Sequence, residues 1–536
     1  MSAGAEVGVI EASIRIGIDV GGTNTDAVLM DGDTVLAEVK RPTTADVTSG
    51  IVSGLGALLE ATGVRPAEIA AVMIGTTHFT NAVVEARRLL PVAIVRLGLP
   101  ATAALPPLTD WPARLREAVG GQVFMCHGGH EFDGRPISPL DRDELRRVGA
   151  EIAARGLRTL AVSSVFSPVN DEFEREAAQI ICEEAPGLAV SLSAEVGRLG
   201  LLERENATII NAGLAELAVQ ITGAFRDALA TSGISSPVYL SQNDGTLMSA
   251  EYVERYPVAT FASGPTNSMR GAAMLSGESD CAVVDIGGTT ADIGILSQGF
   301  PREAKMIIEI AGVRTNFRMP DVLALGIGGG SHVTPGGDPL VGPESVGDAL
   351  TERGLVFGGD TLTASDLAVA AGRALIGDPA LVAGLSRELV DAALASIERR
   401  IAEAVDRMKV SAQPLPVVVV GGGSVLLGDS LTGASRLVRP EHFAVANAIG
   451  ASIAQVGGEV DHMVSIGPGL SREQALERAR DQACERAVAA GAASDSVRVV
   501  DIEELALAYV PGNAVRIKVK AIGELAIRRR VGARTG

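Results

Sequence analysis

The chain has 536 residues, of which 47% are hydrophobic, 3% aromatic and 21% charged, and its formal net charge is −19. A chain of this length is expected to form two or three domains with large buried cores. Its negative charge and scarce aromatic side chains disfavour nucleic-acid binding, which needs basic grooves and base-stacking platforms.

The first residues and the cysteines bear on the cellular compartment. Residues 1–13 are predicted to be a loose leader, because they lack the basic segment and apolar core of a signal peptide. The apolar stretches are too short or too interrupted to predict a membrane span. Four scattered cysteines are typical of reduced thiols in the cytosol: Cys126, Cys182, Cys281 and Cys484. We therefore expect a soluble cytoplasmic protein.

The first predicted strand ends in a glycine-rich turn. Residues 16–30 read IGIDVGGTNTDAVLM, in which a β-branched apolar run predicts a buried strand. Its two glycines let the backbone approach a ligand closely, and the nearby N–H groups and threonine hydroxyls suit phosphate oxygens. Asp31-Gly32-Asp33 then predicts a hairpin turn. Residues 45–62 have the apolar spacing of a helix.

Residues 70–90 predict a strand, a polar turn and a helix, and the helix start suits an anion. The turn gives four candidate substrate contacts: Thr76, Thr77, His78 and Asn81. The alternative is that Thr76 and Thr77 only cap the helix.

Residues 91–185 differ in character and are predicted to elaborate the first domain. Cys126, His127 and His130 lie within five residues, a spacing that can bind Zn²⁺. A closed zinc site needs four ligands on a rigid frame, so we favour an exposed loop here. A single long helix is predicted over residues 203–230.

The pattern of the first loop returns in the second half of the chain. Residues 282–296 read AVVDIGGTTADIGIL, so both loops contain Asp-x-Gly-Gly-Thr-x-x-Asp. Two copies indicate a duplicated domain with a nucleotide between its halves. A glycine-rich segment follows, and its Ser331 and His332 are further candidates to contact substrate or nucleotide.

Three more elements complete the chain. An apolar stripe predicts a helix over residues 386–409. Residues 417–424 read VVVVGGGS, a strand that ends in glycines, and residues 442–452 are predicted to form a helix of small residues. The tail is predicted to be a small added module with a helix and a hairpin.

The order of the two loops and the third glycine-rich strand resembles the actin, sugar-kinase and heat-shock-70 ATPase superfamily. The resemblance implies an α/β fold with two actin-like (RNase H-like) ATPase domains around a nucleotide cleft, and a small α/β C-terminal module. It implies ATP and Mg²⁺ as cofactors. We expect a leader at 1–13, domains at 14–202 and 203–462, and the module at 463–536. The candidate nucleotide-binding residues are Gly21, Gly22, Thr23, Asn24, Thr25, Gly287, Gly288, Thr289, Thr290, Gly421, Gly422, Gly423 and Ser424.

A narrower resemblance, from about residue 14 to 460, is to the hydantoinase A/oxoprolinase family. It rests on DVGGTNTD, GTTHFTNAVVEARR, SGPTNSMRGAA, DIGGTTAD, GIGGGSHV, VGPESVG and LTASDLAVAAGRAL in this order. The family resemblance implies ATP-driven opening of a cyclic amide, lactam or imide. It also implies a B-type subunit, which the tail is too short to hold. We therefore expect that the chain either needs a separate B-type partner or performs only the phosphorylation step, and we expect an oligomer.

Two aspartates are the candidate catalytic and metal-binding residues. Asp19 and Asp285 can hold Mg²⁺ through water, and either can orient the attacking group. Asp26 and Asp292 either cap the next turn or belong to the site. The alternative functions are a small-molecule kinase of the same superfamily and an ATP-driven reactivating or remodelling factor.

Overall fold

The structure is a computed structural model. It describes residues 14–21, 24–43, 47–304, 308–317, 319–453, 455–467, 469–507 and 513–526. The expected leader and two predicted nucleotide-binding residues, Gly22 and Thr23, lie outside the described residues.

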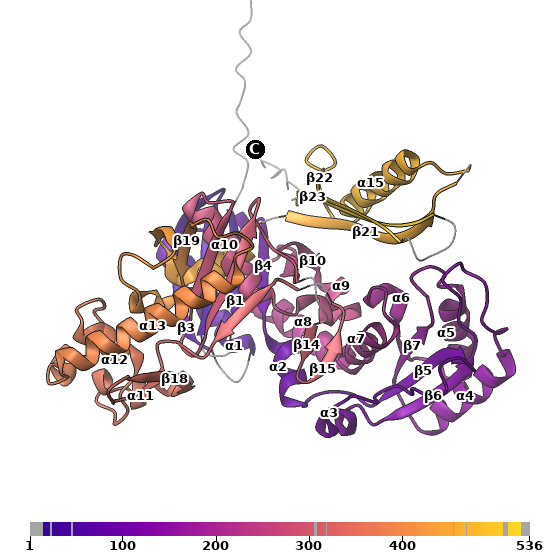
Figure 1. The fold of residues 1–536 in the computed structure, drawn as a ribbon, viewed down its shortest axis with the longest axis horizontal. Coiled ribbons are helices and arrows are strands. Elements are labelled where there is room, and N and C mark those ends of the chain that lie inside the picture. Colours follow the sequence, from indigo (N-terminus) through magenta and orange to yellow (C-terminus); the bar gives the residue numbers. More distant parts are fainter. Residues whose placement is uncertain are drawn as a thin grey trace, which may run out of the picture.

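The first domain is built on a nine-stranded sheet in the order β22-β23-β21-β10-β9-β4-β1-β2-β3 (Figure 1). β1 and β2 form an antiparallel hairpin, β2 continues into β3 through the predicted turn, and β4 runs parallel to β1. The strands are β1 (Ile14–Val20), β2 (Asn24–Asp31), β3 (Thr34–Pro42), β4 (Ala71–Thr76), β9 (Val238–Ser241), β10 (Leu247–Ser249), β21 (Gln455–Ser465), β22 (Arg498–Ala506) and β23 (Ala514–Glu524).

The second domain repeats this arrangement. β11 and β12 form an antiparallel hairpin, and β19 runs parallel to β11 as β4 does to β1. The strands of this sheet are β11 (Cys281–Ile286), β12 (Ala291–Ser297), β13 (Phe300–Pro301), β16 (Val322–Leu325), β19 (Leu415–Val420) and β20 (Ala434–Val438). The duplicated α/β fold predicted from the two loops is therefore confirmed.

Two helices of small residues, α10 (Ser263–Ser276) and α14 (Ala446–Ala451), pack against each other and join the domains. Their backbones nearly touch, because a Cβ atom on Gly271 would lie 1.9 Å from the carbonyl oxygen of Ala446. α14 also packs on β1, and α10 on β11 and β19. Polar residues on these two helices therefore lie between the sheets.

Larger helices cover the outer faces. α1 (Val47–Thr62) and α8 (Ala215–Thr231) belong to the core of the first domain, and α13 (Arg387–Met408) to that of the second. The apolar stripe predicted for α13 is confirmed, since its members are buried: Val390, Leu394, Ile397, Ile401, Val405 and Met408. The shorter helices of the second domain, α11 (Leu350–Arg353) and α12 (Ala364–Ala370), lie beside the hairpin of β17 (Ser331–Thr334) and β18 (Leu340–Ser345).

Residues 91–192 form a parallel sheet of their own in the order β6-β5-β7-β8. The strands are β5 (Val92–Leu99), β6 (Gln122–His127), β7 (Thr159–Ser164) and β8 (Ala189–Leu192), with α4 (Arg142–Ala154) and α5 (Glu172–Glu184) between them in sequence. This inserted sheet has a separate hydrophobic core.

The helix expected over residues 203–230 is instead two helices, α7 (Leu201–Gly213) and α8, bent by 53° at Leu214. Together they meet the length and apolarity of a membrane span, but within the described ranges no single helix does. α7, α8, β9 and β10 belong to the first domain, although the expected boundary lies at 202/203. The expected boundary at 462/463 falls inside β21.

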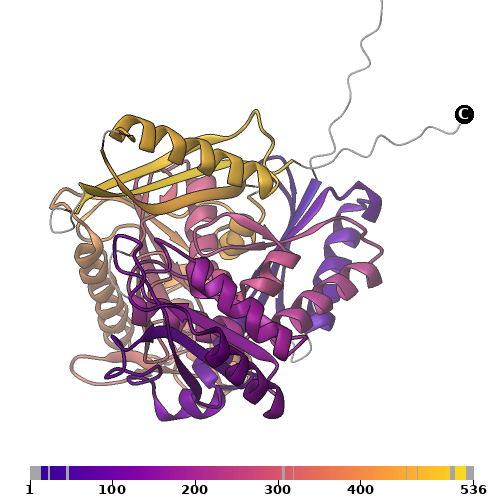
Figure 2. The same cartoon turned by 90° about the vertical axis from the view of Figure 1, so that its right-hand side faces the viewer.

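The C-terminal module adds β21, β22 and β23 to the edge of the first sheet and covers them with α15 (Arg472–Ala489) (Figure 2). α15 buries a stripe of Ala475, Ala479, Ala483 and Ala487 on these strands. β23 carries two lysines, Lys518 and Lys520. They are mostly buried, with their ammonium groups 2.7 Å from Glu303 and 2.9 Å from Asp244.

Candidate functional site

The two aspartate motifs occupy equivalent hairpins. Asp19 lies directly opposite Asp26 in the β1–β2 pair, and Asp285 lies opposite Asp292 in the β11–β12 pair. Each intervening turn is closed by the same hydrogen bond. The N–H of Gly21 donates to the Asn24 carbonyl at 3.0 Å, and the N–H of Gly287 donates to the Thr290 carbonyl at 2.9 Å. The sequence repeat is therefore also a structural repeat.

A glycine stands beside each of the two leading aspartates. A Cβ atom on Gly75, at the end of β4, would lie 2.4 Å from Oδ1 of Asp19. A Cβ atom on Gly421, just after β19, would lie 2.2 Å from Oδ1 of Asp285, and Gly421 has a φ of +81°. Side chains at these positions would displace both carboxylates, so the glycines define where the aspartates lie.

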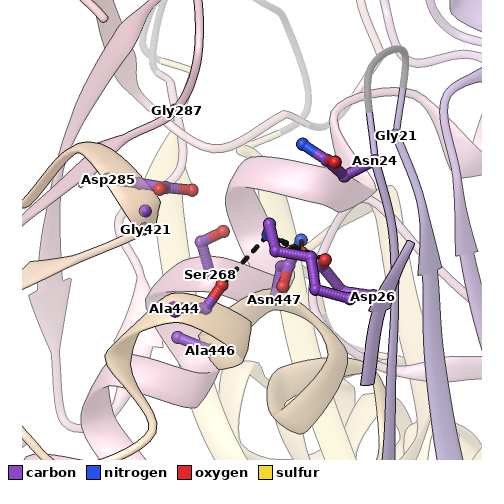
Figure 3. A pocket seen from close by; sticks show the side chains of 12 residues that line it. Gly21, Asn24, Asp26, Ser268, Asp285, Gly287, Gly421, Ala444, Ala446 and Asn447 are labelled. Atoms are coloured by element: carbon purple, nitrogen blue, oxygen red, sulfur yellow. Dashed lines mark hydrogen bonds and ion pairs between the residues drawn. The ribbon is translucent and has the colours of Figure 1, made fainter. Parts of the chain in front are cut away.

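The ends of these strands surround a pocket between the two domains (Figure 3). Asp285 and Gly421 lie on one side, and Asn24 and Asp26 on the other, with Ser268 and Asn447 between them. Six predicted residues line this pocket: Gly21, Asn24, Asp285, Gly287, Gly421 and Gly422. Asp26, for which capping was the alternative, also lines it.

Sequence reasoning missed Lys40, Ser268, Ala444, Ala446 and Asn447, which also line the pocket. Lys40 comes from β3, Ser268 from α10, and Asn447 from α14. The only signal for them was indirect: α10 carries a family motif, and α14 was predicted as a helix of small residues. Neither pattern singles out one polar side chain.

The pocket holds a network of charges. Lys40 Nζ lies 2.7 and 2.8 Å from the two carboxylate oxygens of Asp26 and donates to the Ala444 carbonyl at 3.3 Å. The side-chain amide of Asn447 lies 3.0 Å from Oδ2 of Asp19 and 3.0 Å from Oδ2 of Asp26. Asn447 thus ties together the two aspartates of the first hairpin.

Burial makes three aspartates of the two hairpins weaker acids: Asp19, Asp285 and Asp292. Burial, with the neighbouring Asp26 charge, raises the pKa of Asp19 to about 7, although hydrogen bonding by Asn447 opposes the rise. Burial also raises the pKa of Asp285, against a hydrogen bond from Ser268 and the charge of Lys40. Burial and the Asp285 charge raise the pKa of Asp292 to about 7. A bound cation would relieve this concentration of negative charge.

Several predicted nucleotide contacts have other roles or positions. Thr25 is buried and its hydroxyl lies 3.2 Å from that of Thr43. Gly423 and Ser424 are buried, Gly423 against Ile286 and Gly287. Thr289 and Thr290 are exposed in the turn of the second hairpin.

The glycine-rich segment before Ser331 packs against the second loop and donates hydrogen bonds to it. The N–H groups of Gly329 and Gly330 donate to the carbonyls of Gly287 and Gly288 at 3.0 and 2.6 Å. A Cβ atom on Gly328 would lie 2.5 Å from the carbonyl carbon of Gly288 and the nitrogen of Thr289. Ser331 and His332 do not line the pocket: Ser331 Oγ is buried and accepts the Gly328 N–H at 2.8 Å, and His332 Nδ1 lies 3.7 Å from Glu344.

Two family models match most of the chain. The model for the hydantoinase/oxoprolinase N-terminal region matches residues 15–185, and the hydantoinase/oxoprolinase model matches residues 204–376, together more than half of the sequence. The chain belongs to the hydantoinase/oxoprolinase family. The predicted family resemblance is confirmed.

Relatives within the hydantoinase/oxoprolinase family are distant in sequence. The alpha subunit of caprolactamase from Pseudomonas jessenii is 27% identical over 496 residues, which is 85% of this chain and 69% of that protein. The gamma subunit of acetophenone carboxylase from Aromatoleum aromaticum is 26% identical over 397 residues, 68% of this chain and 53% of that protein. The crystal structure of the ATP-dependent caprolactamase from Pseudomonas jessenii has a TM-score of 0.75 at 19% identity, covering 96% of this chain and 88% of that one. This likeness shows the fold.

In this hydantoinase/oxoprolinase chain, the polar turn after β4 lies beside the first loop. Thr76 pairs with Val20, and the N–H of Thr77 donates to the Val20 carbonyl at 3.4 Å. Thr76 Oγ1 lies 2.6 Å from His78 Nδ1, and Asn81 Nδ2 donates to Thr77 Oγ1 at 3.4 Å. Thr77 precedes α2 (His78–Glu85) without a side-chain capping bond. The turn adjoins the pocket without lining it.

The side chains of Cys126, His127 and His130 lie in three different environments. Cys126 is in the core of the inserted sheet, and burial raises its pKa to about 12. His127 is exposed, with Nδ1 3.2 Å from Glu144. His130 is buried with its ring centroid 4.3 Å from that of Phe173. Elsewhere too, the described part of the chain has no group of three His, Cys, Asp or Glu residues arranged to hold a metal ion.

Proposed function

We propose that the chain is the ATP-binding A subunit of a hydantoinase/oxoprolinase-type amidohydrolase, which phosphorylates a cyclic amide, lactam or imide for ring-opening hydrolysis. One observation carries this proposal. Two equivalent hairpins from two domains face one pocket, in which Asp26, Asp285 and Lys40 meet the backbones of both turns. Such a pocket suits a polyphosphate held between two domains.

The chemistry needs positioning more than covalent catalysis. A lactam carbonyl is a poor electrophile because its nitrogen donates into it. Transfer of the γ-phosphoryl group to the carbonyl oxygen breaks the bond to the β-phosphate, releases ADP and gives an imidate phosphate. Water then adds to the carbon and the C–N bond breaks, which leaves an acyl phosphate. A second water hydrolyses this acyl phosphate to the carboxylate and inorganic phosphate. Backbone N–H groups of the two turns and the Lys40 ammonium would stabilise the charge on the transferred group.

The acidic side of the pocket fits Mg²⁺. Asp19 adjoins the pocket without lining it. Its buried Oδ1 makes no hydrogen bond of regular geometry to a described residue, although the Asn267 amide close by lowers the pKa of the carboxyl group. Carboxylate oxygens are the ligands that Mg²⁺ prefers. Asp19 and Asp285 would hold the ion, directly or through water. When bound, Mg²⁺ would neutralise phosphate charge. The chain's own groups, Asn447 and Ser268, hold the two carboxylates in place.

Substrate and partner are further parts of the proposal. Thr76, Thr77, His78 and Asn81 remain our candidates for the substrate side, because the turn that carries them adjoins the first loop. The two relatives are named as subunits, which supports a separate B-type partner and an oligomeric assembly. A location in the cytoplasm stays a prediction.

The test is ADP release by the purified chain with Mg-ATP in the presence of hydantoin, 5-oxoproline, caprolactam, succinimide or a sugar panel. Cyclic-amide-dependent ADP release that Asp19→Ala abolishes would support the proposal. Release that depends on a sugar would instead identify a kinase. Release that responds to an added protein but needs no cyclic amide would identify a remodelling factor.

A further inference from the structure

A second crevice lies between the inserted parallel sheet and the C-terminal module. Its floor is formed by residues 167–171, after β7, and by Ala194, Gly197, Arg198 and Leu199, after β8. Its roof is formed by Val460–Met463 of β21 and by Arg486 of α15. Figure 1 shows β21 and α15 above α5 and the short helix α6 (Ser193–Val196). The volume of about 370 Å³ lies in the usual range for small-molecule sites. None of its lining residues belongs to the nucleotide pocket.

The crevice occupies the place where parallel sheets of this kind bind ligands. Ligands of open α/β sheets bind outside the carboxyl ends of the strands, and the floor follows the carboxyl ends of β7 and β8. The neighbouring position, between the ends of β5 and β7, is filled by the chain itself. There, His130 N–H donates to the Val165 carbonyl at 3.1 Å and Val165 N–H to the Leu97 carbonyl at 3.2 Å.

Buried charges hold the floor rigid. The carboxylate of Glu174 accepts the N–H of Ser164 at 2.8 Å and the N–H of Ala194 at 3.0 Å. The Arg204 guanidinium donates to Ser193 Oγ at 2.9 Å and to the Arg198 carbonyl at 3.1 Å. Both side chains are almost completely buried. Burying two charged groups is costly, and here they fix the loops that form one wall of a crevice.

Most charges of the crevice wall are already compensated. Arg516 donates to both carboxylate oxygens of Asp461 at 2.8 and 2.6 Å, and Arg175 lies 2.7 Å from Asp171. Arg198 donates to Glu303 at 3.2 Å through Nη2. Its Nε is buried without a hydrogen-bond acceptor among the described residues, and the nearest carboxylate oxygen of Asp461 is 3.9 Å away.

Arg486 is the exception. Its side chain is exposed, its guanidinium donates to the backbone carbonyl of Glu459, and within the described ranges it has no carboxylate partner. Burial and the Arg486 charge both lower the pKa of His462, so this imidazole is neutral at pH 7 and adds no second cation. Among the described residues that line the crevice, Arg486 therefore supplies one positive charge without a carboxylate counter-charge.

We propose that this crevice binds a small monocarboxylate, with the Arg486 guanidinium as its counter-charge and Arg198 Nε as a further donor. A planar guanidinium fork matches a carboxylate. A phosphate monoester carries a charge of about −1.5 to −2 at pH 7, and one arginine neutralises only part of it. The remaining negative charge would lie beside the carboxylates of Asp171 and Asp461. The site is separate from the nucleotide pocket and does not depend on the proposed function.

The experiment is saturation-transfer NMR on the full chain with 4-hydroxybutyrate, succinate and inorganic phosphate, each titrated with and without ATP. We expect 4-hydroxybutyrate to bind more tightly than succinate or phosphate, with the same Kd whether or not ATP is present. Arg486→Gln should weaken binding about tenfold, as the loss of a charged hydrogen bond does. Ala194→Leu, which adds volume inside the crevice, should abolish binding.

The matched control is Arg480→Gln, an exposed arginine of the same helix that does not line the crevice. It should leave the Kd unchanged. The proposal is overturned if 4-hydroxybutyrate does not bind, if phosphate binds more tightly, or if Arg486→Gln and Arg480→Gln have equal affinity. Competition by ATP would also overturn it, by placing the ligand in the nucleotide pocket. ADP release plays no part in these readouts, so a failure of the proposed function is separately visible.

Discussion

Gly75 lies so close to Asp19 that a Cβ atom on the glycine would come within 2.4 Å of Oδ1 and within 2.5 Å of the Asn267 side-chain amide. Gly421 has the same relationship to Asp285 at 2.2 Å. In each half of the molecule, the parallel strand next to the hairpin thus ends in a glycine that fixes the carboxylate. The repeat therefore includes this third strand as well as the motif Asp-x-Gly-Gly-Thr-x-x-Asp.

We expect Gly75→Ala to lower the rate of ADP release about a hundredfold, because even a 1 Å displacement of a positioning group has an effect of this size. Gly56→Ala is the matched control, since a Cβ atom there meets nothing within 4 Å in the helix α1. The control should keep full activity and gain up to about 1 kcal/mol of stability. Full activity of Gly75→Ala would contradict the assigned position of Asp19.

The activity should depend more on the charge of the side chain at position 447 than on its size. Asn447→Asp replaces the amide that donates to Asp19 and Asp26 with a third carboxylate, so we expect kcat for ADP release to fall more than tenfold. Asn447→Ala removes the donor without adding charge and should have a smaller effect. Thermal unfolding of both variants separates folding from activity. Equal activity of the two variants would contradict a role in charge balance.

Lys40 should matter for nucleotide binding and for stability. Its ammonium is the partner of the Asp26 carboxylate, whose side chain is only 4% exposed. Lys40→Gln should raise the KM for ATP about tenfold and lower the free energy of unfolding by about 1–3 kcal/mol. The control is Arg41→Gln, an exposed neighbour that does not line the pocket. Equal KM values for the two variants would place Lys40 outside the nucleotide site.

The two hairpins could be predicted from the sequence because each motif is local. The position of Lys40 opposite Asp26 could not be predicted in this way. The turn pairs Asp31 with Thr34, and an uninterrupted register from there would place Val39 opposite Asp26. A bulge between Leu29 and Met30 shifts the register by one residue, so that Lys40 lies opposite Asp26 instead. A hairpin register read from the turn alone misses the lysine.

Site residues from distant parts of the chain could not be predicted from local sequence patterns, because only the folded chain brings them together. Asn447 reaches Asp19 across 428 positions, through the close packing of α14 on β1. Ser331 has a partner within its own segment. A serine after a glycine run suggests a ligand contact, yet its hydroxyl accepts the Gly328 N–H and stabilises the segment beneath the second loop. The Asn447 contact is decided by tertiary packing, whereas the Ser331 contact is made within a turn of three residues.

The ion pair between Asp244 and Lys520 of the C-terminal module predicts how the stability of the fold depends on pH. Burial alone would raise the pKa of Asp244, but Lys520 and hydrogen bonds from Thr246 outweigh it and hold the pKa below its usual range. Because the folded pKa is depressed, this carboxylate stabilises the fold above its unfolded pKa of about 4 and loses that effect as pH falls further. Asp244→Asn leaves the buried Lys520 ammonium without its partner and should cost about 3 kcal/mol at pH 7.

Urea unfolding at pH 7, 5 and 3 checks this sign. The difference in stability between the wild type and Asp244→Asn should be constant from pH 7 to 5 and shrink at pH 3, because only the wild type has a carboxylate there to protonate. Asp495→Asn, at an exposed position of the same module, should match the wild type at pH 7. A difference that grows towards pH 3 would mean that Asp244 is protonated more easily in the folded chain than in the unfolded one, contrary to its pairing with Lys520.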